Sequence, residues 1–587
     1  MLEVAHAALE TESGLHQEIN RKPIRTALVV LLVFYLFAWL YTSAHFMADT
    51  NIYTQAILRH QHGGASGDFR LSTANPFWDF GHLLWRPLGW LCFVVTRPIA
   101  AIISQQNERA EVLFTLIAVN SLAALACVIF FFLLARRALN NYWAAVLAGV
   151  AFCTADAFLN YAHSGNAYVV GLACLLAGMY FSNLDEQPHW FYARSVLAGV
   201  MYALAVLFWF PYIFVLPAAI ALPSIIYGHN HTRQRMAAIT LGTTALVGLV
   251  AYLSTGILAG VKSITDFRDW ALTSSHGQIQ ALGLRALARL GFSIPRSFIN
   301  MDRDGMVLKR YLVHDPYAHV SVSDLLRLSW WKVVFFYASV SVILIELVRS
   351  RAGRRVLAVL IFAVLPVLVF ALFIFEAGSI ERYLPLYPFI FLAYGFVIVS
   401  KNSHLTSKVL LLCFLLCMAS LNIIDMSRTR LAYQRSEAVK RIRDLVPSLQ
   451  PNSIVMAINE QDSLAQFRQN FPLAQLNLQA QWQSYDMLEL NTARLLTWRE
   501  DFASRVLACW RRGGTVWLPT RVFRSRPEPD WGWVEGDDKR ISWTDVRLFF
   551  SELEIGTTIG GQDGFVEIPD DPKNQSFLES FTHTRLQ

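Results

Sequence analysis

Charged residues are scarce in this chain. Only 16% of its 587 residues are Asp, Glu, Lys or Arg, whereas 55% are hydrophobic. Soluble domains carry about 25% charged residues, so the composition excludes a wholly soluble protein. The net charge of +7 is spread over short loops, which is typical of membrane orientation and argues against a nucleic-acid partner.

Cysteine patterns and the common catalytic motifs are also missing. Six of the seven cysteines lie in apolar runs and only Cys509 lies in the polar C-terminal part, which excludes a disulfide framework there. The sequence has no CxxC pair and no GxGxxG, GxSxG, P-loop or HExxH string. We therefore expect no cofactor and identify no metal site, although the sequence does not exclude a divalent metal.

A cleavable signal peptide is absent as well. An acidic, polar stretch of about 20 residues precedes Arg21, Lys22 and Arg25, and the first apolar run follows. This order predicts an uncleaved start whose basic flank lies on the inner side of the membrane.

Long apolar runs dominate the chain as far as about residue 425. A membrane-spanning helix needs about 17–25 apolar residues, and nine runs qualify: 26–44, 112–135, 143–160, 166–182, 236–258, 331–348, 356–375, 384–400 and 408–425. The stretch 195–227 is long enough for two short spans. Charges and prolines interrupt the stretch 82–103.

Basic loops decide between the possible topologies. They occur at residues 136–137, 229–235, 349–355 and 401–408. All four lie inside only if 195–227 crosses twice and 82–103 does not cross. We therefore predict a polytopic α-helical membrane domain, 1–425, with about 11 transmembrane helices.

The same topology predicts what lies outside the membrane. It gives two outer loops, 45–110 with an interfacial helix at 82–103, and 259–330. Residues 426–587 read as an extracytoplasmic α/β domain, with helices at 428–446 and 493–511 and strands at 453–458 and 513–519. The unusual polar residues then gather on the outer side.

Asp49 and Tyr53 follow the first span in the stretch "HFMADTNIYTQAIL". Four residues apart on a helix, they would share one face. A partly desolvated carboxylate at the membrane boundary has the properties of a general base. The plainer alternative is an interfacial aspartate that caps a helix.

The order of motifs resembles the polytopic GT-C glycosyltransferases, which use polyprenyl-phosphate sugars. In "DTNIYTQAILRH…GDFRL…HLLWRPLGWL", the residues that match the family are Asp49, Tyr53, Gly67-Asp68 and Pro87-Leu88. The segment 134–152 is similar to the family's third segment. "ERYLPLYPF" resembles the "RYxLPxxP" string of the protein mannosyltransferase and lipid A aminoarabinose transferase branches.

The chain also departs from the family pattern. Asp49-Thr50 stands where many relatives have Asp-Glu, and Trp85-Arg86-Pro87 stands where they have Lys-Pro-Pro or His-Pro-Pro. The relatives' second acidic outer position has no clear counterpart, although Asp156 and His163 lie nearby in sequence. These departures leave the branch and the acceptor open.

Glu381, Arg382 and Tyr383 stand at the mouth of a late apolar run. A guanidinium there can bind the phosphate of a lipid-linked donor bidentately. Such a charge-assisted hydrogen bond contributes about 1.5–3 kcal/mol, comparable to the roughly 2.5–3.5 kcal/mol penalty for a charge at a membrane centre. Glu381 would orient Arg382. The alternative is a snorkelling arginine in an aromatic belt.

Three further residues are weaker candidates for substrate contacts. His82 and Arg86 lie four residues apart, and Arg86 is a candidate second phosphate ligand or a headgroup anchor. His163 is a candidate substrate contact or an ordinary polar loop residue. The basic amphipathic stretch 285–298 predicts a helix lying on the membrane surface.

The resemblance implies an inverting glycosyltransferase with Asp49 as general base. We expect a polyprenyl-phosphate sugar donor, a glycan, lipid or protein acceptor, and a place in a bacterial inner membrane with the site on the periplasmic side. Two alternatives remain open. One is an outer-leaflet polysaccharide polymerase or ligase; the other is a secondary transporter, which should carry ionisable or broken segments near mid-membrane.

Overall fold

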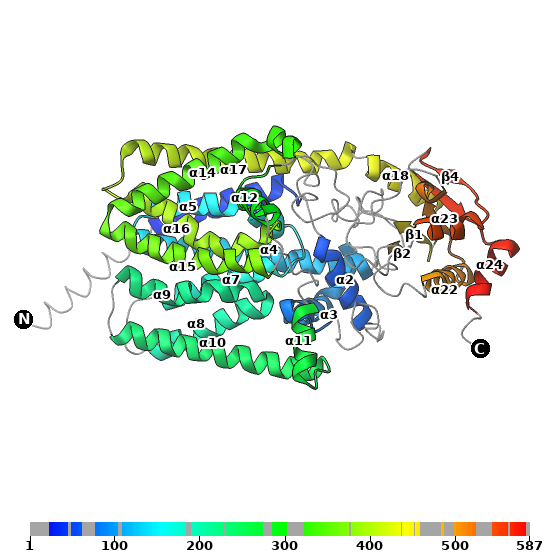
Figure 1. Ribbon diagram of the computed structural model, residues 1–587, viewed down its shortest axis with the longest axis horizontal. Helices are drawn as coiled ribbons and strands as arrows, with labels where there is room; N and C mark the ends of the chain where they lie inside the picture. The colour runs from blue at the N-terminus through cyan, green and yellow to red at the C-terminus, as the bar shows by residue number, and fades with distance from the viewer. Residues whose placement is uncertain are drawn as a thin grey trace, which may run out of the picture.

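A computed structural model shows a bundle of long helices joined to a small mixed sheet (Figure 1). The structure describes residues 23–44, 48–61, 77–103, 108–183, 190–227, 231–273, 284–301, 322–374, 377–435, 437–450, 452–457, 483–486, 498–523, 543–561 and 564–582. Gly67 and Asp68, which match the family motif in the sequence, lie outside these ranges.

The first half of the bundle begins with the helix Pro23–Tyr41. The elements that follow it are α2 (Ala48–Gln61), η1 (Phe80–His82), α3 (Trp85–Ile103), α4 (Glu108–Leu139), α5 (Tyr142–Thr154), α6 (Asp156–Ala162), α7 (Tyr168–Ser182), α8 (Phe191–Phe208), η3 (Phe210–Val215), α9 (Leu216–Tyr227) and α10 (His231–Leu258).

The second half contains two helices of the loop 259–330 and four long helices. Its elements are α11 (Ile264–Thr273), α12 (Leu284–Phe298), α14 (Val322–Arg349), α15 (Arg351–Phe373), η4 (Ile380–Leu386), α16 (Tyr387–Val399) and α17 (Leu405–Arg435).

Eight helices in the described part of the chain are long and apolar enough to cross a membrane. The bent pair α5–α6 makes a ninth candidate, and Tyr168–Ser182 and Phe210–Ile225 are shorter apolar helices. Together these helices cover all eleven stretches predicted as spans. The stretch 195–227 contains two helical segments, α8 and the joined η3–α9, because the backbone is extended at Trp209, two residues before Pro211.

The span predicted at 143–160 is not straight. Its axis bends by 66° between α5 and α6, where Ala155 is extended with φ −61° and ψ 139°. The break frees the carbonyl of Thr154, which accepts a hydrogen bond from Asn422 Nδ2 at 2.8 Å. Asn422 on α17 also joins Phe298 O (2.7 Å) and Asn300 N (2.8 Å) at the end of α12.

The interfacial helix predicted at 82–103 begins at Trp85, and His82 belongs to the preceding 3-10 turn. Helix α3 is not among the eight membrane-span candidates. In Figure 1, α2, α3 and α11 lie at the end of the bundle that faces the C-terminal domain. Arg97 ties α3 to α4 through Glu108 (3.4 Å) and Glu111 (3.6 Å).

The C-terminal part is α/β. Helix α17 runs past residue 425 to Arg435 and leads into α18 (Glu437–Leu445) and η5 (Val446–Ser448). The other elements are β1 (Ile454–Ala457), β2 (Gln483–Asp486), α22 (Trp498–Arg511), β3 (Val516–Pro519), η6 (Thr520–Phe523), α23 (Trp543–Ser551), β4 (Thr558–Ile559), β5 (Phe565–Ile568) and α24 (Pro572–Thr582).

The five strands form one sheet in the order β2-β1-β3-β5-β4. Strand β1 is parallel to β2 and β3, and β5 is antiparallel to β3 and β4. Strands β1 and β3 match the strands predicted at 453–458 and 513–519. The helix predicted at 493–511 is α22, which begins at Trp498.

Candidate active site

Asp49 lies in the first turn of α2, where a carboxylate is favoured by the helix dipole. It is half-buried, and its Oδ2 accepts a hydrogen bond from the hydroxyl of Tyr168, the first residue of α7. This contact joins two segments about 120 residues apart in the chain and fixes one carboxylate oxygen.

The turn between α6 and α7 holds α2 and α3 beside each other. Gly165 N donates to Thr50 Oγ1 at 3.0 Å, and Gly165 O accepts from Trp85 Nε1 at 2.9 Å. A Cβ at Gly165 would lie 2.7 Å from Thr50 Cγ2 and 2.8 Å from Leu116 Cβ. Only a glycine at this position therefore lets the turn lie so close to α2, the helix that carries Asp49.

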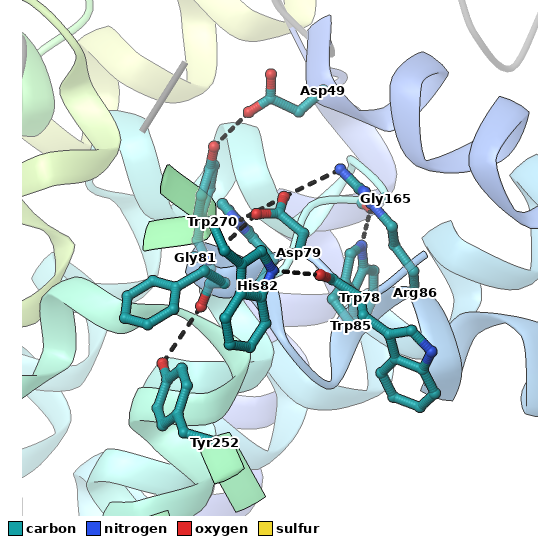
Figure 2. Close-up of polar contacts among 12 residues, drawn as sticks. Asp49, Trp78, Asp79, Gly81, His82, Trp85, Arg86, Gly165, Tyr252 and Trp270 are labelled. Carbon is teal, nitrogen blue, oxygen red and sulfur yellow. Dashed lines mark hydrogen bonds and ion pairs between the residues drawn. The ribbon is translucent and has the colours of Figure 1, made fainter. Parts of the chain in front are cut away.

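A first arginine cluster lies between α2 and α3. Arg86 Nη2 is 3.0 Å from Asp79 Oδ2, and its guanidinium carbon lies 5.5 Å from the centre of the Tyr53 ring. His82 Nδ1 is 3.8 Å from the same Asp79 oxygen. Figure 2 shows Asp79 between Arg86 and His82. Arg86, His82 and Tyr53 are all buried.

The Tyr53 hydroxyl lies within electrostatic range of four charged side chains. Burial raises the pKa of Tyr53 well above its usual value, and the carboxylates of Asp49, Asp79 and Glu381 raise it further, whereas Arg86 lowers it. Tyr53 therefore stays a neutral hydrogen-bond donor at ordinary pH.

A second arginine cluster lies where η4 meets η3. Arg382 is buried, with its guanidinium carbon 5.7 Å from the centre of the Trp209 ring. Its Nη2 is 4.0 Å from Glu381 Oε1, and Glu381 Oε2 accepts a hydrogen bond from Tyr161 at 2.7 Å. Pro385 lies within the short η4 and Pro388 in the first turn of α16, where proline is tolerated.

Tyr168 joins Asp49 to both arginine clusters. Its ring centre lies 5.8 Å from that of His82 on the Arg86 side. On the Arg382 side it lies 4.7 Å from Trp209 and 4.8 Å from Tyr161. Tyr168 thus contacts the Asp49 carboxylate and also residues that neighbour Arg86 and Arg382.

Two predicted site residues lie apart from this arrangement. His163 is buried in the α6–α7 turn, with Nε2 2.9 Å from Thr42 Oγ1 and its ring stacked on Trp39. Tyr383 is fully buried, and its hydroxyl donates to Ala377 O at 2.7 Å and lies 3.1 Å from Ser293 on α12.

Four residues of the site escaped the sequence analysis: Asp79, Tyr161, Tyr168 and Trp209. Asp79 could have been found in the sequence as an acidic residue just ahead of the predicted interfacial helix that carries Arg86. Among the described residues, no group of three or more His, Cys, Asp or Glu side chains could hold a metal ion.

The sequence matches no family model and no curated protein with which it was compared. Its structure is similar to that of ArnT from Cupriavidus metallidurans bound to undecaprenyl phosphate, with a TM-score of 0.50 at 10% identity, over 94% of this chain and 98% of that one. The Archaeoglobus fulgidus oligosaccharyltransferase in the apo form matches with a TM-score of 0.43 at 11% identity, over 85% and 70% of the two chains. The ArnT comparison confirms the GT-C-like fold that the order of motifs implied.

Proposed function

We propose that this chain is a membrane glycosyltransferase that moves a sugar from a polyprenyl-phosphate donor to an acceptor, with inversion at the anomeric carbon. The observation that carries the proposal is the set of contacts that Tyr168 makes. It donates a hydrogen bond to Asp49, and its ring packs against His82 of the Arg86 cluster and Trp209 of the Arg382 cluster. The fold adds support, because the similar ArnT structure holds undecaprenyl phosphate.

In the proposed reaction, an acceptor hydroxyl or amine attacks the anomeric carbon of the donor sugar. The bond between that carbon and the phosphate oxygen breaks, and its electron pair leaves with the polyprenyl phosphate. The proton of the acceptor passes to Asp49, which acts as general base. Tyr168 holds Oδ2, so the proton is received at Oδ1.

The two arginines would bind the phosphate, whose negative charge grows as the sugar leaves. A guanidinium suits this role because its planar fork matches phosphate oxygens. Tyr53 and His82 flank Arg86, and Glu381 orients Arg382. His163 and Tyr383 stay predicted substrate contacts, although His163 Nε2 lies 2.9 Å from Thr42 Oγ1 and the Tyr383 hydroxyl lies 3.1 Å from Ser293 Oγ.

The position of the site in the membrane belongs to the same proposal. We propose that residues 1–425 form the membrane domain of a bacterial inner-membrane protein and that 426–587 form a periplasmic domain. Helices α2 and α3, which carry Asp49 and Arg86, lie at the end of the bundle nearest the C-terminal domain (Figure 1). If that domain is periplasmic, the site lies on the same side. The basic loops, which should remain inside, motivate this orientation.

A purified-protein assay with a panel of labelled polyprenyl-phosphate sugars tests the proposal. The full chain in nanodiscs should transfer label from at least one donor to an acceptor in a membrane extract and release polyprenyl phosphate. If no donor is consumed, whereas proteoliposomes accumulate a solute, the chain is a transporter and the proposal is wrong.

A further inference from the structure

The loop that carries Asp79 is fixed on three sides. Trp270 Nε1 on α11 donates to Trp78 O at 2.8 Å, Tyr252 on α10 donates to Phe80 O at 3.3 Å, and Leu84 N donates to Leu207 O at 3.1 Å. Figure 2 shows the Trp270 and Tyr252 contacts below the Asp79 carboxylate.

The Phe80 ring adds an aromatic anchor, since it packs against four rings: Phe210, Tyr252, Phe267 and Trp270. Backbone held by hydrogen bonds and buried rings has little freedom to move. Asp79 therefore stands on a rigid support.

The Asp79 carboxylate uses its two oxygens differently. Oδ1 accepts from Gly81 N at 3.1 Å and caps η1, which sets the orientation of the carboxylate. Oδ2 is 3.0 Å from Arg86 Nη2, and only 10% and 7% of the two side chains is exposed. The contact spans seven residues, from the 3-10 turn to the second residue of α3.

Arg86 is thus held along one edge by Asp79 and across one face by Tyr53. An arginine has five N–H donors, and one is directed at Asp79. Within the described part of the chain, Arg86 Nε has no hydrogen-bond partner. The guanidinium is therefore restrained in position while it keeps donors for an anion.

We propose that Asp79 is a positioning residue that holds Arg86 in the geometry that binds the donor phosphate; this inference rests on the proposed function. A flexible arginine loses side-chain entropy when it binds an anion, and a partner that holds it beforehand reduces that loss. Asp79 also offsets the cost of burying the guanidinium.

If Asp79 acted only through its charge, it would weaken phosphate binding instead of favouring it. The Asp79 carboxylate lies beside Arg86 and would repel a phosphate bound to that arginine. If charge alone mattered, removing it would strengthen phosphate binding. If positioning dominates, removal weakens binding, and an uncharged acceptor of the same shape restores much of it. The sign of the change separates the two roles.

The test measures the affinity of the full chain in nanodiscs for undecaprenyl phosphate. Asp79→Ala should weaken binding about tenfold, which corresponds to about 1.4 kcal/mol. Asp79→Asn, which keeps the acceptor oxygen, should recover most of the affinity. Unchanged or tighter binding in Asp79→Ala would overturn the inference.

A double-mutant cycle separates positioning from a general loss of structure. The variant Asp79→Ala/Arg86→Ala should bind no more weakly than Arg86→Ala, because Asp79 acts through Arg86. Additive losses would overturn the inference. Asp571→Ala is the matched control, because Asp571 also caps a helix: it accepts a hydrogen bond from Asn574 N at 2.7 Å at the start of α24 in the C-terminal domain. The Asp571→Ala variant should bind undecaprenyl phosphate as tightly as the parent.

The outcomes also distinguish this inference from the proposed function. If the parent chain binds no undecaprenyl phosphate, the proposed function is wrong and the inference falls with it. If the parent binds and Arg86→Ala weakens binding, but Asp79→Ala does not, the proposed function stands and only the positioning role is wrong.

Discussion

At the scale of single residues, the site joins charges that are costly to bury unless they have partners. Asp49 is held by Tyr168, Arg86 by Asp79, and Glu381 by Tyr161. Each partner comes from another part of the fold or from across a turn. The buried polar groups are thus restrained before any substrate arrives, which is what a preorganised phosphate site requires.

Arg382 provides the first prediction. Arg382→Ala should weaken binding of undecaprenyl phosphate at least about tenfold, because a charge-assisted hydrogen bond contributes about 1.5–3 kcal/mol. Arg382→Lys should restore only part of the affinity, since lysine lacks the planar fork. Equilibrium binding of the labelled lipid to purified variants measures this.

The control for Arg382 is Arg351→Ala, an exposed arginine at the start of α15, which should bind like the parent. Native affinity in the Arg382→Ala variant would show that Arg382 is a snorkelling anchor instead of a phosphate ligand.

Parts of the site could be predicted from the sequence. Asp49, Arg86, Glu381 and Arg382 are conspicuous because each is a charge beside or within an apolar stretch. Tyr53 and His82 lie four residues from Asp49 and Arg86, respectively. Asp79 was missed because its contact with Arg86 crosses a 3-10 turn and the start of α3, so helical spacing does not reveal it. Tyr168 and Trp209 were missed because an aromatic residue in an apolar run gives no distinct signal.

At the scale of elements, breaks in the helices shape the region around the site. The bend at Ala155 starts the short α6, which ends in the turn that holds Thr50 and Trp85. The length of the apolar runs predicted the helices well, because burial in the bundle or in lipid depends on composition. It did not predict the bend, whose freed carbonyl is satisfied by Asn422, 268 residues away.

The Asn422 contacts provide a prediction about stability. Asn422→Ala removes three buried hydrogen bonds to the backbone, at Thr154 O, Phe298 O and Asn300 N. At about 1 kcal/mol each, the loss should be roughly 3 kcal/mol. Thermal unfolding of the detergent-solubilised chain should show a clearly lowered midpoint.

The matched control for Asn422 is Asn402→Ala, because Asn402 is exposed in the turn before α17 and should unfold like the parent. Equal midpoints for the two variants would show that the α5–α6 bend does not depend on Asn422.

At the scale of the whole molecule, the described part of the chain contains eight helices long enough to cross a membrane, one bent pair and two shorter apolar helices. If each of these eleven candidates crosses once, the two ends of the chain lie on opposite sides of the membrane. We predict that the C-terminal domain lies outside and the basic loops inside. Alkaline phosphatase fused after Gln587 should therefore be active, and a fluorescent reporter that folds only in the cytoplasm should stay dark. The reverse pattern would contradict this topology.

The central claim is that Asp49 accepts the proton of the acceptor during sugar transfer. Asp49→Asn keeps the size of the side chain and can still accept a hydrogen bond from Tyr168, but it cannot act as a base. General-base catalysis contributes about 100- to 10,000-fold in rate. Single-turnover transfer by the purified variant, with the donor that serves the parent, is the most direct measurement. The account predicts unchanged donor affinity and thermal midpoint with a rate at least about 100-fold lower, whereas a near-native rate in the folded variant would contradict it.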